Sequence, residues 1–370
     1  MRSLRVLLTN NTLATRAGSE LYVRDVATAL LRAGHAPVAY SPVLGEVAEE
    51  LRAATVPVLD DLKFLTVPPD VIHGQHHMET MTALLHFPGV PAVSFCHGWI
   101  PWEEAPPIHP RIRRYVAVDR ACLDRITLEC GIPASRTELV LNFVDLERFR
   151  PRPPLPPRPL RALLFSNNAG IDTHLRAVTE ACARAGIALD VAGLGVGRIS
   201  AAPESLLLGY DLVFAKARAA LEAMAVGASV VLCDAAGSGP LVSAANFQVL
   251  RELNFGIRTL SEPLDPEVLL SQIARYDPSD SAEVSRTVRA TASLRDAMER
   301  LMAIYERVVA ERGEPTDDAA EGPAAAAYLR EWSLKMKGAA LAPEAHKLRA
   351  QIRALTEERA LAAETSARTS

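Results

Sequence analysis

Short apolar runs alternate with longer segments of helical periodicity along most of the chain. Residues 5–9 form an apolar run that predicts a buried strand, and residues 19–33 then place apolar side chains at helical spacing. Gly34 ends this helix, and residues 37–40 predict the next strand. Strands that alternate with helices are typical of a parallel sheet with helices on both faces. Further strands are expected at 71–72, 92–95, 115–118 and 138–141.

The same alternation starts again at residue 161. Residues 161–165 predict a strand, and Asp172 is placed to cap the helix that follows it. A later helix around residues 219–225 is expected to stop at Gly227. We therefore expect a second doubly wound sheet in this half. Its further strands are predicted at 187–191, 211–214 and 229–233.

Six of the 26 prolines crowd into residues 151–159. Each proline removes a hydrogen-bond donor and restricts the residue before it, which excludes a helix interior or a central strand. We expect a stiff linker of residues 151–160 between a domain of residues 1–150 and a second domain of residues 161–311. Residues 312–370 read as a polar breaker segment and an Ala-rich helical tail. Its apolar positions, Leu341, Leu348, Ile352, Leu355 and Ala362, favour a solvated helix packed on the body over an oligomerisation element.

Composition narrows the class of protein. The 370 residues are 49% hydrophobic, which is enough for sizeable cores, and the length suits two domains. A net charge of -4 argues against a dedicated nucleic-acid binder. Five cysteines without a C-x-x-C pair suggest neither a disulfide framework nor a zinc site. No apolar run approaches the ~20 residues of a membrane span, so we expect a soluble cytoplasmic protein.

Candidate chemistry gathers where the predicted strands end. Doubly wound sheets bind ligands at the carboxyl ends of their strands, where helix N-termini favour phosphate. Lys216 and Arg218 precede or open a short helix, so their charges suit a diphosphate. Glu222 lies about one turn further along an otherwise apolar helix. A sugar hydroxyl would satisfy its carboxylate, and so would a salt bridge with Arg218; both interpretations stay open.

Glycine and small polar residues follow other strands. Gly18 would let the backbone approach a ligand after the first strand, and Ser19 is placed to cap the helix there; an ordinary capped turn is the alternative. After the first two strands of the second half stand further candidates, weak individually, namely Ser166, Asn167, Gly193 and Gly195.

His97 directly follows an apolar strand and could hydrogen-bond a hydroxyl or transfer a proton, unless it is simply a buried core histidine. His73, His76 and His77, with Glu79 nearby, form a second group. They lack the one-face helical spacing of a zinc helix, which favours acceptor contact over metal binding. We therefore assign no metal ligand.

Taken in order, these motifs resemble a family-4 glycosyltransferase of the GT-B fold over residues 1–310. The resemblance implies two Rossmann-like domains that face each other across a cleft, with a helical tail added here. The matching segments are residues 17–23 with 31–35 (glycine-rich loop, first helix and turn), 95–98 (cleft histidine), 142–149 (end of the first domain), 221–231 (donor-site helix and strand) and 265–267 (a later helix start).

The resemblance also implies an activity. A UDP-, GDP- or dTDP-sugar would bind to the C-terminal half, and its sugar would pass with retention to a glycan, protein or small-molecule acceptor near the N-terminal half, with no required cofactor or metal. It implies His97 and Glu222 as catalytic residues, Glu222 touching the ribose or donor sugar and His97 a sugar near the reacting centre. Lys216 and Arg218 would bind the diphosphate, and Gly18 a phosphate through its backbone.

The sequence departs from the family pattern at three places, one of which is residues 198–210, too short for the extra strand and helix that the family normally has there. Phe214 stands where the family has an earlier Glu, and Ser166, Asn167 and Asn168 replace its basic residues. A catalytically degenerate GT-B binding or scaffold protein, or a sugar-nucleotide epimerase of this fold, therefore remains an alternative. Peripheral membrane association and a homo-oligomer formed through the C-terminal helix also remain open.

Overall fold

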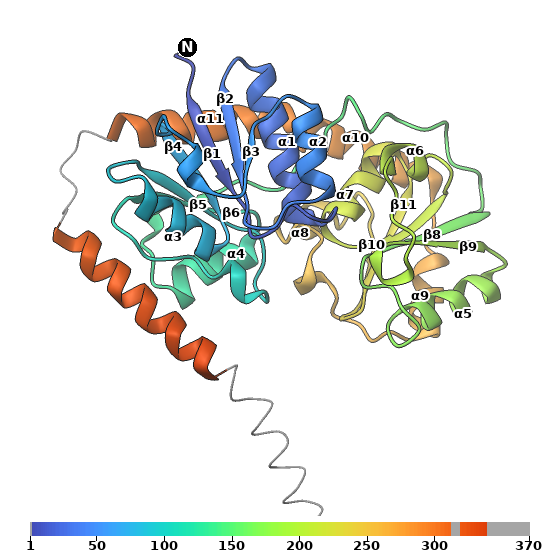
Figure 1. Ribbon diagram of the computed structural model, residues 1–370. Coiled ribbons are helices and arrows are strands. Elements are labelled where there is room, and N and C mark those ends of the chain that lie inside the picture. The colour runs from blue at the N-terminus through green and yellow to red at the C-terminus, as the bar shows by residue number, and fades with distance from the viewer. Residues whose placement is uncertain (1, 312–318, 339–370) are drawn as a thin grey trace, which may run out of the picture. The chain divides into compact units, whose positions relative to one another are not determined.

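A computed structural model describes residues 2–311 and 319–338 of the chain. The described residues up to 311, apart from 108–110, belong to one compact unit that holds two β-sheets (Figure 1). Residues 108–110 and the helix of residues 319–338 belong to a second unit. The tail positions from Leu341 to Ala362 lie outside the described residues. Within the described part of the chain, every helix is too short or too polar to cross a membrane.

The first sheet has seven parallel strands in the order β3-β2-β1-β4-β5-β6-β7. Its central strands β1, β4 and β5 are almost wholly buried, as expected for a parallel sheet covered on both faces. The strands are β1 (Arg5–Thr9), β2 (Ala36–Tyr40), β3 (Val58–Leu59), β4 (Val71–Gln75), β5 (Ala92–Cys96), β6 (Ile112–Ala117) and β7 (Thr137–Leu139), and the helices are α1 (Gly18–Arg32), α2 (Glu46–Ala53), α3 (His77–His86) and α4 (Arg120–Asp124).

The second sheet has five strands in the order β12-β11-β10-β8-β9, of which only β12 is antiparallel to its neighbour. Two parallel α/β sheets with covering helices confirm the fold class expected from the sequence. The strands are β8 (Arg161–Phe165), β9 (Ala188–Ala192), β10 (Leu212–Ala215), β11 (Ser229–Asp234) and β12 (Gly237–Leu241), and the helices are α5 (Leu175–Ala185), α6 (Pro203–Leu207), α7 (Ala217–Val226), α8 (Phe247–Glu252), α9 (Pro266–Ile273) and α10 (Pro278–Thr291).

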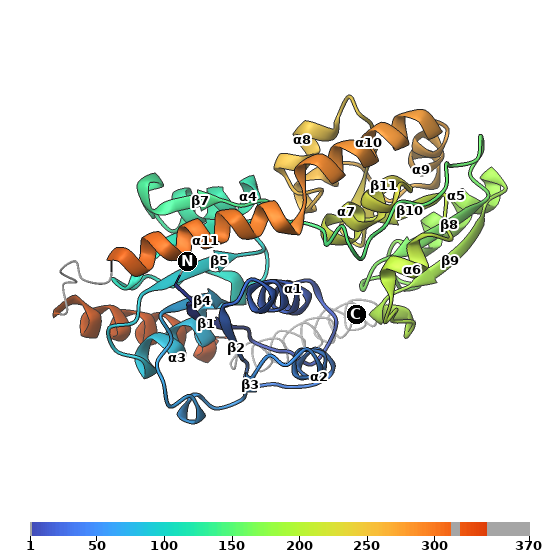
Figure 2. The same cartoon turned by 90° about the horizontal axis from the view of Figure 1, so that it is seen from above.

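The last helix of the compact unit, α11 (Leu294–Ala310), packs on the first sheet although the sequence counted it with the second domain. Leu301 and Tyr305 are fully buried in the same core cluster as Val6 and Leu8 of β1. Figure 2 shows α11 along one face of this sheet and α3 on the other. The predicted second domain of residues 161–311 therefore includes a helix that packs elsewhere, because the apolar stripe of α11 completes the core of the first sheet.

Helix α7 lies in the core of the second half and carries the principal site candidates. Leu221 is fully buried and Met224 nearly so, both in the core that also contains β10 and β11. Gly227 ends the helix with a φ of 96°, a left-handed conformation that glycine adopts without strain. The predicted end of this helix is confirmed.

Two capping predictions are wrong. Helix α5 begins at Leu175, three residues beyond Asp172, because Thr173 holds a turn there through hydrogen bonds to Gly170 and Asn168. Helix α1 begins one residue before Ser19, so the Ser19 side chain lies inside the first turn. Its hydroxyl donates a hydrogen bond to Glu20 rather than capping the helix. Side-chain caps require a position just outside the helix, and neither residue has it.

The proline-rich segment is fastened to the second half. Arg152 forms a 2.8 Å ion pair with Asp211, and its backbone N–H donates to the carbonyl of Val226. The hydroxyl of Tyr276 donates to the carbonyl of Pro156 at 3.0 Å. The connection is therefore held by polar contacts as well as by the restricted backbone of its prolines.

Candidate functional site

A pocket of about 230 Å³ lies where the strands β8, β9, β10 and β11 end, and the start of α1 forms part of its wall. This is the edge at which a doubly wound sheet is expected to bind a ligand. Both halves of the chain contribute, with Arg16, Ala17, Gly18 and Leu21 from the first and residues from Phe165 onward from the second. The predicted site residues that line it are Gly18, Ser166, Asn167, Gly193, Lys216, Arg218 and Glu222.

Three predicted residues lie elsewhere. Gly195 serves packing, since a Cβ there would come within 2.3 Å of the carbonyl oxygen of Ala169. Ser19 is turned to Glu20, as described above. His97 belongs to the first half and is described below.

Lys216 stands at the N-cap of α7 and forms an ion pair with Asp234, the last residue of β11. Asp234 is buried and also accepts a hydrogen bond of 2.8 Å from Ser166 and one of 3.0 Å from Asn168. Burial alone would raise the pKa of Asp234, but the Lys216 ammonium and the hydrogen bond from Ser166 hold it below the usual value. An ionised Asp234 therefore fixes the Lys216 ammonium at the pocket.

The backbone beyond Lys216 faces the same pocket. Ala217 opens α7 with a φ of 49°, and its N–H donates to the carbonyl of Phe255 at 2.8 Å. A left-handed conformation is unusual for a residue other than glycine and concentrates at functional sites. Residues 217–219 line the pocket, so the positive end of the helix lies beside the Lys216 cation.

Arg218 and Glu222 form a buried ion pair along α7. Nε of Arg218 donates to Oε1 of Glu222 at 2.8 Å, and its Nη2 reaches Asp25 on α1. Burial raises the pKa of Glu222, and the positive charge of Arg218 opposes that rise. The salt bridge between Arg218 and Glu222 that the sequence left open is therefore present, but it lies inside the protein rather than on a helix surface.

His97 follows β5 in the first half and is surrounded by aromatic rings. Its ring centroid lies 4.5 Å from that of Tyr22 in an edge-on arrangement. The Nε2 atom of His97 and the hydroxyl of Tyr22 are buried and have no hydrogen-bond partner among the described residues. Burial lowers the pKa of His97 to about 4, so the imidazole is neutral near pH 7. A neutral ring with an unpaired nitrogen could bind a ligand hydroxyl.

Glu104 positions the loop that carries His97. One carboxylate oxygen accepts the backbone N–H of His97 at 2.8 Å, and the other lies 3.4 Å from Nε2 of His76. The Nδ1 atom of His76 accepts the backbone N–H of Asn11 at 3.1 Å. The charge of Glu104 raises the pKa of His76 against the opposing effect of burial. Buried polar contacts thus connect the ends of three segments of the first half.

The other histidines have separate partners. His73 bonds the hydroxyl of Tyr305 and stacks on Phe95 with ring centroids 3.7 Å apart. His77 meets Trp102 edge-on at 5.4 Å. Residues 2–311 and 319–338 contain no group of three His, Cys, Asp or Glu side chains arranged to hold a metal ion. The structure therefore does not bring His73, His76 and His77 together around one point.

Sequence reasoning missed several residues of this site. Asp234 had a signal, because it is a lone carboxylate after an apolar strand. Asp25 and Glu104 gave none, since their partners Arg218 and His76 are 193 and 28 residues away along the chain.

Comparisons with known proteins agree with this arrangement. Residues 16–148 match the model of Glycosyltransferase Family 4. A glycosyltransferase from Rickettsia africae ESF-5 is similar in structure, with a TM-score of 0.60 and 14% identity over 84% of this chain and 99% of that one. The Anabaena protein HepE, solved with UDP and glucose, gives a TM-score of 0.59 and 16% identity over 82% of this chain and 99% of that one.

A third similar structure is sucrose-phosphate synthase from Thermosynechococcus elongatus, with a TM-score of 0.55 and 15% identity over 84% of this chain and 100% of that one. The curated proteins include no sequence match to the chain. The two sheets and these structures define the fold as GT-B. Residues 16–148 are a glycosyltransferase family 4 domain within it.

Proposed function

We propose that the chain is a glycosyltransferase that moves a sugar, with retention, from a UDP-, GDP- or dTDP-sugar to a glycan, protein or small-molecule acceptor. The observation that carries this proposal is the convergence of Lys216, the N-terminus of α7 and the Glu222 carboxylate on one pocket. A cation beside a helix N-terminus suits a diphosphate, and a carboxylate suits the hydroxyls of a ribose or a sugar. The similar HepE structure with UDP and glucose supports the same ligand class.

The proposed chemistry follows from charge. As the bond between the anomeric carbon and the diphosphate breaks, negative charge grows on the leaving diphosphate. Lys216 and the α7 N-terminus would stabilise that charge without a metal, because both are fixed before the reaction starts. His97 would contact a sugar near the reacting centre through its neutral ring. Arg218 would act on the donor mainly through Glu222, since its Nε and Nη2 atoms already pair with carboxylates.

The test is the release of nucleoside diphosphate from UDP-, GDP- and dTDP-sugars. We expect one donor to be consumed, and Lys216→Ala and Glu222→Ala to slow its consumption about 100-fold, the typical cost of losing one such group. Lys63→Ala is the matched control, because this exposed lysine pairs with Asp61 away from the pocket. Unchanged rates in both pocket variants would remove the proposed donor site.

One observation favours a second candidate, a GT-B protein that binds nucleotide without turnover. Lys216 and Arg218 are already paired with buried carboxylates, Lys216 with Asp234 and Arg218 with Asp25 and Glu222. The pocket therefore presents less unpaired positive charge than its residue types suggest. This candidate predicts nucleotide binding with no diphosphate release from any donor, and the same assay separates the two.

A further inference from the structure

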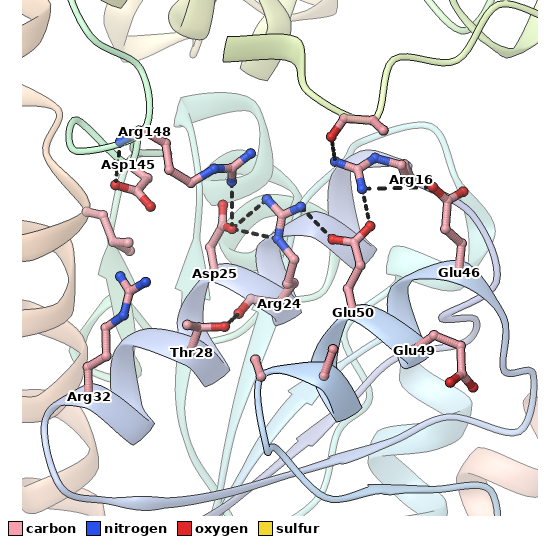
Figure 3. Close-up of a pocket in the computed structure, with 14 residues that line it drawn as sticks. Arg16, Arg24, Asp25, Thr28, Arg32, Glu46, Glu49, Glu50, Asp145 and Arg148 are labelled. Carbon is pink, nitrogen blue, oxygen red and sulfur yellow. Dashed lines mark hydrogen bonds and ion pairs between the residues drawn. The ribbon is translucent and has the colours of Figure 1, made fainter. Parts of the chain in front are cut away.

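Asp25 is a buried carboxylate on α1 at which three arginines converge. Arg24 reaches its Oδ1 at 2.7 Å, and Arg148 lies 3.6 Å from the same oxygen, as Figure 3 shows. Arg218 of α7 reaches the other oxygen, Oδ2. Burial would raise the pKa of Asp25, but Arg218 and Arg24 hold it below the usual value. Asp25 is therefore an anion fixed inside the protein.

The guanidinium of Arg218 connects Asp25 to the pocket. Its Nη2 donates to Asp25 and its Nε to Oε1 of Glu222, so one rigid planar group binds both carboxylates. Only 13% of the Arg218 side chain is exposed, so this contact is shielded from solvent. Oε1 is the only oxygen of Glu222 with a partner among the described residues, and the residue lines the pocket. The other oxygen thus remains for a ligand.

We propose that Asp25 is a positioning residue, which through Arg218 orients the Glu222 carboxylate to accept a hydroxyl of the bound nucleotide's ribose. This inference rests on the proposed function, because it assumes a nucleoside diphosphate in the pocket. It adds that the donor site in the second half is complete only when α1 of the first half supplies an anion. Arg218 held by Glu222 alone would lose one of its two anchors and the fixed geometry they impose.

The surroundings of Asp25 allow this role to be tested without dismantling the fold. Arg24 keeps a second partner when Asp25 loses its charge, since its Nη1 lies 2.9 Å from Glu50. Arg148 likewise keeps Glu204 at 2.9 Å. Glu50 in turn holds Arg16, so the charged side chains of α1 and α2 remain linked in the cluster that Figure 3 shows. Asp25→Asn changes the charge while retaining the shape.

The experiment measures calorimetric affinities for UDP and GDP and for their 2′,3′-dideoxy analogues. The wild-type protein should prefer the nucleotide with ribose hydroxyls about tenfold, the effect of a hydrogen bond to a charged group. In Asp25→Asn this preference should fall to near one, while the dideoxy analogue binds as in the wild type. A general structural defect would weaken both ligands equally. Glu49→Gln is the matched control, because Glu49 is exposed on α2 and, among the residues that the structure describes, pairs only with Arg52.

Arg218→Lys supplies a second variant in case Asp25→Asn does not fold, because a single ammonium cannot bridge both carboxylates in the same geometry. It should lose the hydroxyl preference in the same way. A full preference in either folded variant, or an equal loss for both ligands, would overturn the role of Asp25 while leaving the proposed function intact. If the wild-type protein binds no nucleotide, the proposed function fails and this inference with it.

Discussion

The Nε atom of Arg218 lies 2.8 Å from Oε1 of Glu222, one turn along α7. The contact means that the carboxylate expected to meet a ligand is already oriented by the protein. It also means that Arg218 is not a free cation of the pocket, which leaves Lys216 and the helix N-terminus as the principal groups for a diphosphate.

Lys216→Met should destabilise the protein by about 1–3 kcal/mol at pH 7, because Asp234 would remain buried without its cation. The pKa of Asp234 in the folded wild type lies below its usual value, so its contribution to stability is present above the unfolded pKa and is lost as the pH falls through the folded one. In Lys216→Met the pKa of Asp234 in the folded protein rises. The difference in free energy of unfolding between the wild type and this variant should therefore narrow as the pH falls toward 4.

Urea unfolding at pH 7 and pH 4.5 measures this effect. Lys63→Met should leave the unfolding curve unchanged, because 65% of the Lys63 side chain and 44% of that of its partner Asp61 are exposed to solvent. If the free energies of unfolding of the wild type and Lys216→Met differ by the same amount at both pH values, the loss of the ion pair with Asp234 is not the cause of the destabilisation.

His97 should make stability depend on pH. Burial lowers its folded pKa to about 4, below its usual value, so the unfolded chain takes up a proton first as the pH falls below about 6.5. Between pH 7 and pH 5 the wild-type protein should therefore lose about 2 kcal/mol more stability than His97→Asn, which cannot titrate. Parallel stability curves for the two proteins would place His97 in a more polar environment than the structure shows.

Two glycines of the pocket should respond in opposite ways to alanine. A Cβ at Gly193 would come within 1.9 Å of the carbonyl oxygen of Ser166, and the residue has a φ of 150°. Gly193→Ala should cost more than about 2 kcal/mol in thermal unfolding. A Cβ at Gly18 would meet nothing within 4 Å. Gly18→Ala should therefore be as stable as the wild type. It should bind the nucleotide more weakly, because the added methyl group narrows the pocket. Equal stability of both variants would contradict this difference.

Most strands of the two sheets could be predicted from sequence because they are short apolar runs buried in a parallel sheet, whereas the two-residue β3 and the glycine-rich, antiparallel β12 were not predicted. The run at residues 161–165 coincides with β8, and Gly227 marks the end of α7. Local capping was less predictable, since Thr173 delays α5 past Asp172 through turn contacts. The packing of helix α11 was also not predictable, because its apolar stripe indicates a buried helix face but not which of the two sheets that face covers.

Some residues of the candidate site could likewise be predicted from sequence, and others could not. Lys216 and Glu222 were found because a charge at the start of a helix, or within an apolar one, requires a partner. The identity of that partner was not predictable for Lys216, since Asp234 meets it only through the pairing of β10 with β11. Asp25 was hidden for a related reason, because a carboxylate next to an arginine on α1 resembles an ordinary surface pair.

The proposed function requires the pocket at the carboxyl ends of β8, β10 and β11 to bind the diphosphate of a nucleotide-sugar. Calorimetric titration of UDP, GDP and dTDP into the wild-type protein, Lys216→Ala, Glu222→Ala and the control Glu49→Gln tests it most directly. We expect saturable binding of at least one of these nucleotides, weakened at least about tenfold in both pocket variants and unchanged in the control. Binding that is absent from the wild type, or equally strong in all four proteins, would contradict it.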